Sequence, residues 1–70
     1  MEPRHRLMLL EARSDAQIRS DKTRDAIYAL TSLRTYFSSE EDSESLIRAW
    51  VTEDKRLQSE IHNYDEFLKL

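Results

Sequence analysis

The sequence contains no glycine, no cysteine and only one proline among its 70 residues. Without glycine the chain cannot form a glycine-rich phosphate loop, a dinucleotide-binding fingerprint or an Asn-Gly hairpin turn. Without cysteine it has neither disulfide bonds nor thiolate ligands for a metal ion. We therefore predict no catalytic residues, no cofactor and no metal site, and we classify the chain as not an enzyme.

Long apolar runs are also missing. The apolar run nearest the N-terminus, Leu7 to Leu10, has four residues. A signal peptide needs an apolar region of about 7–15 residues, and a membrane span needs about 20. We therefore expect no membrane association, and a location in the cytoplasm, or in the nucleus if the source is eukaryotic or viral.

The charges are abundant and unevenly placed. The net charge is −3, but residues 1–37 contain seven Lys/Arg and five Asp/Glu, whereas residues 38–70 contain four and nine. The two halves therefore carry charges of opposite sign. This asymmetry favours packing of one half against the other, or against the opposite half of a partner.

Strong helix formers dominate, so the predicted fold class is all-α. Pro3 suits the first turn of a helix, and no proline or glycine follows it. The clearest break is the acidic, serine-rich segment 38–45, where Ser38 with Glu41, or alternatively Asp42 or Ser43, could cap a helix. We predict one domain, residues 1–70, with a helix over about 4–37, a connector over about 38–43 and a helix over about 44–69.

The second half carries a regular heptad stripe. Its members alternate in spacing between three and four residues, as the buried positions of a coiled coil do: Ile47, Trp50, Asp54, Leu57, Ile61, Tyr64 and Leu68. An isolated two-helix hairpin covers only part of such stripes, whereas a bundle of two hairpins covers more. We predict a homodimer in which this stripe contributes to the interface, opposite Leu30, Leu33 and Phe37.

The first half is less regular. Ala26, Leu30, Leu33 and Phe37 form one apolar stripe, and Leu7, Leu10 and Ile18 form another that is displaced around the helix. We favour one continuous helix. A break near residues 14–17 or 20–21 would instead give three helices.

Asp54 is the only charged member of the second stripe. A carboxylate at such a position must be paired, exposed or neutral. We expect an arginine of the first half, Arg24 or Arg34, to pair with it. A polar residue at this position can set the register and oligomeric state of a bundle.

Two other groups of side chains suggest binding chemistry. Arg6, Arg13 and Arg24 lie on nearly one line of a continuous helix, with Arg34 nearby, and such a ridge could contact the phosphates of a nucleic acid. His62, Asp65 and Glu66 share one helical turn, but three such ligands on an exposed turn are a weak metal signal.

These observations predict a small non-enzymatic regulatory or inhibitory protein that acts through protein–protein contacts of a helical bundle. Short single-domain chains of this type are common in phages and viruses. The alternative is a nucleic-acid-binding helical hairpin that uses the arginine ridge.

Overall fold

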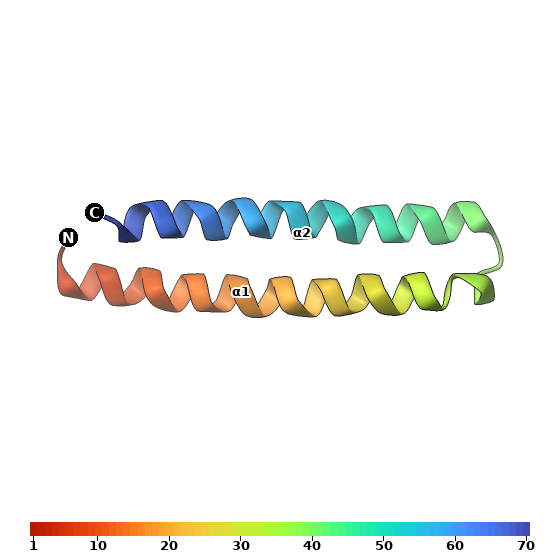
Figure 1. Ribbon diagram of the computed structural model, residues 1–70, viewed down its shortest axis with the longest axis horizontal. Coiled ribbons are helices and arrows are strands. Elements are labelled where there is room, and N and C mark those ends of the chain that lie inside the picture. The colour runs from red at the N-terminus through yellow and green to blue at the C-terminus, as the bar shows by residue number, and fades with distance from the viewer.

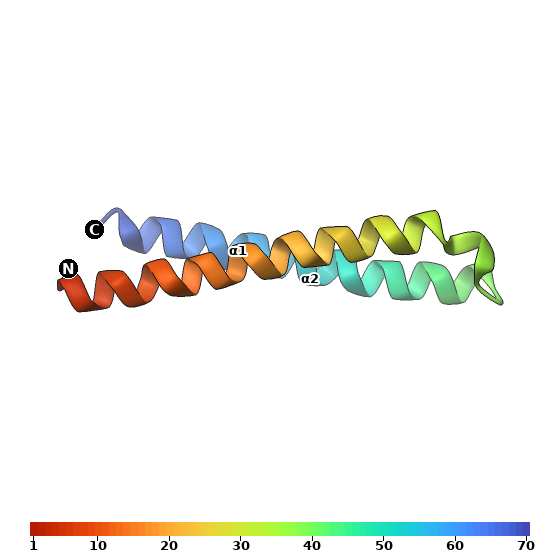
Figure 2. The same ribbon diagram turned by 90° about the horizontal axis from the view of Figure 1, so that it is seen from below.

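The computed structural model describes all 70 residues, and they form an antiparallel helical hairpin (Figure 1). Helix α1 runs over Pro3–Ser32 and helix α2 over Glu40–Leu68, with a short 3-10 helix, η1, over Arg34–Tyr36 between them. The molecule measures 53 × 14 × 12 Å, and both termini lie at the end opposite the connector. Viewed from below, α1 crosses α2 at a shallow angle (Figure 2). Neither helix has a stretch long and apolar enough to cross a membrane.

Helix α1 is continuous, and it does not break near residues 14–17 or 20–21. It ends at Ser32, earlier than the expected residue 37. The hydroxyl groups of Thr31 and Ser32 donate hydrogen bonds to the carbonyl oxygens of Ile27 and Tyr28, at 2.8 and 2.9 Å. Such bonds compete with the backbone ladder and favour bending near a helix end. By Phe37 the backbone is extended, which lets the chain reverse.

Helix α2 begins at Glu40, four residues before the expected start. Ser39 caps it, since the Ser39 Oγ accepts a hydrogen bond from the backbone N–H of Asp42 at 3.1 Å. The cap is therefore a serine of the acidic segment, but not one of the three expected candidates. This start places Glu40, Glu41 and Asp42 in the first turn, where the helix dipole favours negative charge.

The core is a single seam between the two helices, and only six residues are buried. Helix α2 contributes Leu57 and Ile61 from the predicted heptad stripe, together with Ser43. Helix α1 contributes Ala16, Ser20 and Thr23. Because these α1 side chains are small, the larger side chains of α2 have room to pack against the α1 backbone.

The inward face of α1 differs from the expected one. Leu7, Leu10, Ile18 and Leu33 are exposed. The residues that face α2 are buried or half-buried and also follow a heptad spacing: Leu9, Arg13, Ala16, Ser20, Thr23, Ile27 and Leu30. Most members in the middle of this stripe are small or polar, so hydrophobicity alone does not identify it.

Candidate functional site

A polar cluster interrupts the seam near the middle of the hairpin. The fully buried Ser20 donates from its Oγ to Asp54 Oδ1 at 3.1 Å and accepts from Gln58 Nε2 at 2.6 Å. Arg24 Nε lies 3.4 Å from the same Asp54 oxygen. The expected arginine partner of Asp54 is therefore confirmed as Arg24. Every buried side-chain nitrogen or oxygen in the structure has a hydrogen-bond partner, so the cluster leaves no buried polar atom unpaired.

A second cross-helix contact joins Arg13 to Asp65. The guanidinium donates to both carboxylate oxygens, from Nε to Oδ1 and from Nη2 to Oδ2, the latter at 3.3 Å. These hydrogen bonds hold the pKa of Asp65 below its ordinary value and raise the pKa of Arg13. Such a bidentate contact constrains geometry as well as charge, and it fixes the register of the two helices near their termini.

The other two arginines of the predicted ridge are also engaged within the hairpin. Arg6 Nη1 donates to the carbonyl oxygen of Leu68 at 2.9 Å, and Arg34 Nη2 lies 3.5 Å from Glu40 Oε1. Together with Arg13 and Arg24, all four arginines thus contact the second half of the chain. The oppositely charged halves of the chain therefore attract each other within one molecule.

The predicted association residues divide between the seam and the surface. Leu57 and Ile61 are buried, and Trp50 and Leu33 are exposed. The remaining members are half-buried at the edges of the seam: Leu30, Phe37, Ile47, Asp54, Tyr64 and Leu68. The hairpin itself therefore covers the centre of the heptad stripe, and a partner can reach only its edge. The dimer interface stays a prediction.

One side of the hairpin carries a second apolar surface, which we call the Trp50 face. It consists of side chains that flank the seam on one side: Met8 and Ala26 of α1, Leu33 directly after α1, and Leu46, Trp50 and Phe67 of α2. All except the half-buried Ala26 are between 37% and 59% exposed. The sequence analysis placed Ala26, Leu33 and Trp50 in apolar stripes, but it did not group these six residues into one surface. Leu46, Trp50 and Phe67 fit a heptad spacing, which could have identified the α2 members of the face, but no such signal marks Met8.

Charged side chains occupy the middle of the Trp50 face. Arg19 and Lys22 of α1 lie there by the helical period, opposite Glu53 and Glu60 of α2. The pKa of Glu53 is lowered mainly by its hydrogen bond with Arg56, and the positive charge of Arg19 contributes in the same direction. Asp15 also lies there, seven residues from both Met8 and Lys22 on the same row of α1. Between the apolar ends of the face, the charges of Asp15, Arg19 and Lys22 therefore sum to +1 on α1, and those of Glu53, Arg56 and Glu60 sum to −1 on α2.

Arg56 holds the two glutamates in place. Its Nη2 donates to Glu53 Oε1 at 2.6 Å and its Nη1 to Glu60 Oε2 at 3.1 Å. These bonds, chiefly the one to Glu53, raise the pKa of Arg56, and they lower that of Glu53. The Tyr64 hydroxyl donates to the other Glu60 oxygen at 3.1 Å, which raises the pKa of Tyr64. Hydrogen bonds within the hairpin therefore hold the Glu53 and Glu60 side chains in place without a partner.

A further exposed stripe lies on the side of α1 that faces away from α2. It consists of Leu7, Leu10, Ile18 and Tyr28, each at least 45% exposed. Leu7, Leu10 and Ile18 were expected to form a stripe, and in the structure these side chains are exposed on the surface of the hairpin. We call these four residues the outer stripe.

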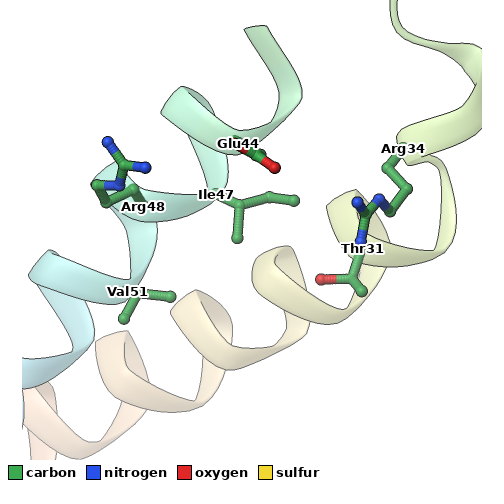
Figure 3. A pocket seen from close by; sticks show the side chains of 6 residues that line it. All are labelled: Thr31, Arg34, Glu44, Ile47, Arg48 and Val51. Atoms are coloured by element: carbon green, nitrogen blue, oxygen red, sulfur yellow. The ribbon is translucent and has the colours of Figure 1, made fainter. Parts of the chain in front are cut away.

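The hairpin also has a shallow hollow between the end of α1 and the start of α2. Thr31, Arg34, Glu44, Ile47, Arg48 and Val51 line it. Figure 3 shows Ile47 in the hollow, with Arg34 and Arg48 on opposite sides of it. Small-molecule sites are usually enclosed, whereas this hollow is open, and four of its six lining residues are polar or charged.

The three residues that gave the weak metal signal, His62, Asp65 and Glu66, contact other side chains or lie too far apart for a hydrogen bond. Asp65 holds Arg13, and His62 Nε2 lies 3.9 Å from Glu66 Oε1. No group of three or more His, Asp or Glu side chains is arranged to hold a metal ion.

Comparison of the chain with protein families, with curated proteins and with solved structures finds no match.

Proposed function

We propose that this chain is a small, non-enzymatic regulator or inhibitor that acts through protein–protein contacts as a homodimeric helical bundle. The observation that carries the proposal is the large surface that the hairpin leaves exposed. We place its action in the cytoplasm, or in the nucleus of a eukaryotic or virus-infected cell.

The exposed area exceeds that of a compact protein of the same mass. A globular chain of 8.4 kDa exposes about 4,600 Å², whereas the hairpin exposes 5469 Å². The excess of about 850 Å² is close to the area, about 800 Å², that one protein contributes to a standard interface. Pairing of two hairpins would remove about this much surface from water.

The small core supports the same conclusion. Only Ala16, Leu57 and Ile61 are buried apolar residues. A domain of this size without disulfides or metals commonly depends on association for its stability. The only tryptophan, Trp50, lies on the exposed side of the seam, and tryptophan is enriched among the residues that dominate binding energy. A dimer through the Trp50 face would cover it and would leave the outer stripe available for a target protein.

The nucleic-acid alternative receives less support. A nucleic acid would have to compete with Asp65, Asp54 and Glu40 for the arginines of the ridge. The net charge of −3 would also oppose binding to a polyanion.

The dimer is tested by light scattering on the purified chain. We expect about twice the 8.4 kDa mass of the single chain at micromolar concentration. Trp50→Lys should give a monomer, because it places a charge in the apolar part of the interface, which the dimer would bury. Tyr28→Lys, on the outer stripe, is the matched control and should leave the dimer intact. A helical monomer for the natural sequence at high concentration would contradict the dimer.

The protein target is tested by cross-linking in cells that make the protein. The same bait carrying Leu10→Lys and Ile18→Lys should lose the target while remaining a dimer. Treatment of the extract with nuclease should not change the recovery. If recovery disappears with nuclease, the nucleic-acid alternative replaces the proposal.

A further inference from the structure

We infer that two copies of this chain pack through their Trp50 faces with both connectors at the same end, so that α1 of each copy lies along α2 of its partner. This inference rests on the proposed dimer and adds its symmetry. The two-fold axis would run parallel to the helices. The other arrangement that buries the same faces has its axis perpendicular to the helices and places the connectors at opposite ends.

The cross-helix bonds show which turns of the hairpin lie side by side. Ser20 bonds to both Asp54 and Gln58, so its turn of α1 is level with the middle turns of α2. Arg19, the neighbour of Ser20, therefore projects from the Trp50 face at the middle of its length. Its electrostatic effects on Glu53 and Tyr64 agree with this position, since one lies on each side of the middle.

With the connectors at the same end, opposite charges meet. Rotation about the long axis keeps each residue at its own level and exchanges α1 for α2. The charges on α1 of each copy, +1 in sum, then lie along the charges on the partner's α2, −1 in sum. Such complementarity across an interface selects an orientation.

With the connectors at opposite ends, like charges meet. Rotation about the perpendicular axis makes the partner run in the reverse direction along the dimer. It places α1 against the partner's α1 and α2 against the partner's α2. Arg19 then faces the partner's Arg19, and Glu53 faces the partner's Glu60. Asp15 approaches the partner's Lys22, but each helix lies along a copy of itself with the same net charge. Arg56 bonds both glutamates and compensates one of their two charges in either arrangement, so it does not remove the difference.

The apolar ends of the face are covered in both arrangements. In the proposed one, Leu33 lies near the partner's Leu46 toward the connectors, Ala26 lies near the partner's Trp50, and Met8 meets the partner's Phe67 near the termini. The reversed arrangement also brings apolar groups together. The central charges therefore decide the orientation.

The distance between the two connectors tests the inference. The chain has no cysteine, so Ser38→Cys provides one attachment point for a nitroxide label on each copy, at an exposed position of the connector. Double electron–electron resonance spectroscopy should give a distance between the two labels within about 30 Å, because neighbouring helices of a bundle are about 8–10 Å apart. Connectors at opposite ends would be separated by nearly the 53 Å length of the molecule. Ser59→Cys, exposed at the middle of α2, is the control and should give a short distance in both arrangements.

A charge reversal provides an independent measurement. Arg19→Glu should weaken dimerisation by about tenfold or more, because it places a negative charge opposite the partner's glutamates. Arg48→Glu, away from the Trp50 face, should change it by less than about twofold. In the reversed arrangement, Arg19→Glu would exchange one like-charge pair for another and leave the affinity nearly unchanged. Circular dichroism must show the same helix content for both variants.

The outcomes separate the inference from the proposed function. A dimer with a short connector distance and a weakened Arg19→Glu variant supports both. A dimer with a connector distance near the full length overturns this orientation and keeps the proposed dimer. A monomer in light scattering overturns both.

Discussion

Ser20 Oγ and Asp54 Oδ1 form a 3.1 Å hydrogen bond between the two helices. The hydroxyl group is completely buried and also accepts a bond from Gln58. It therefore allows a carboxylate to lie beside the core, because the carboxylate is shared between a buried donor and Arg24 at the surface. The stability of the hairpin depends on this polar cluster as well as on its apolar residues.

Removal of the buried hydroxyl group should destabilise the protein. Ser20→Ala leaves Asp54 and Gln58 without a shared partner, and we expect a loss of about 1 kcal/mol or more in the free energy of unfolding. Ser14→Ala, at an exposed position of the same helix, is the matched control, because both variants gain the same helix propensity. Urea unfolding at one fixed protein concentration measures the difference. Equal stability of the two variants would show that the cluster contributes nothing.

Asp54 has a predicted role in specifying the register. Asp54→Leu would complete an apolar stripe, and a completed stripe can adopt other oligomeric states. We expect a change in the mass measured by light scattering. An unchanged mass with a lower midpoint of thermal unfolding would instead assign Asp54 to stability alone.

The contact between Arg13 and Asp65 makes stability depend on pH. Because the pKa of Asp65 is lower in the folded state than its ordinary value of 3.8, its contribution is present above about pH 4 and is lost as the pH falls through the folded-state value. Glu53, whose pKa is also lowered, contributes in the same direction. Asp65→Asn should therefore flatten the pH dependence of thermal unfolding between about pH 5 and pH 2. An identical profile for the variant and the natural sequence would contradict the assignment.

The N-terminal cap of α2 should also be measurable. Ser39→Ala removes the acceptor for the Asp42 N–H, and loss of such a cap costs about 1 kcal/mol. Ser38→Ala, one residue earlier, is the control and should have little effect. If Ser38→Ala is the more damaging of the two, the helix begins at a different residue in solution.

The hairpin, its continuous first helix and the inward face of α2 follow from the sequence by elementary rules. The heptad stripe from Ile47 to Leu68 is apolar at all but one position, and its spacing predicts both a helix and the buried side of that helix. An arginine partner for Asp54 was also predicted, as Arg24 or Arg34, since a carboxylate in such a stripe needs a partner. The structure selects Arg24.

Apart from Leu30, the inward face of α1 was not predicted, and the reason is chemical. Ser20 and Thr23 are buried because each hydroxyl group is bonded, Thr23 to the carbonyl oxygen of Arg19 at 2.7 Å. A scale of hydrophobicity ranks both residues below Leu7 and Ile18, which the structure places on the outside. Which face of α1 is buried depends on where α2 packs. The sequence of α1 alone does not determine that position.

The observed bounds of the connector differ from the predicted bounds for a related reason. Several serines and acids between Ser38 and Ser45 can each cap a helix, so local rules leave the first residue of α2 undetermined. The choice of Ser39 depends on where the chain can reverse after Phe37.

The two termini lie at one end of the hairpin, and Arg6 bonds to the carbonyl oxygen of Leu68 there. The order of the helices along the chain is therefore not essential to their packing. A short glycine linker between Leu70 and Met1, with new ends opened in the connector, would give a circular permutant that retains the seam.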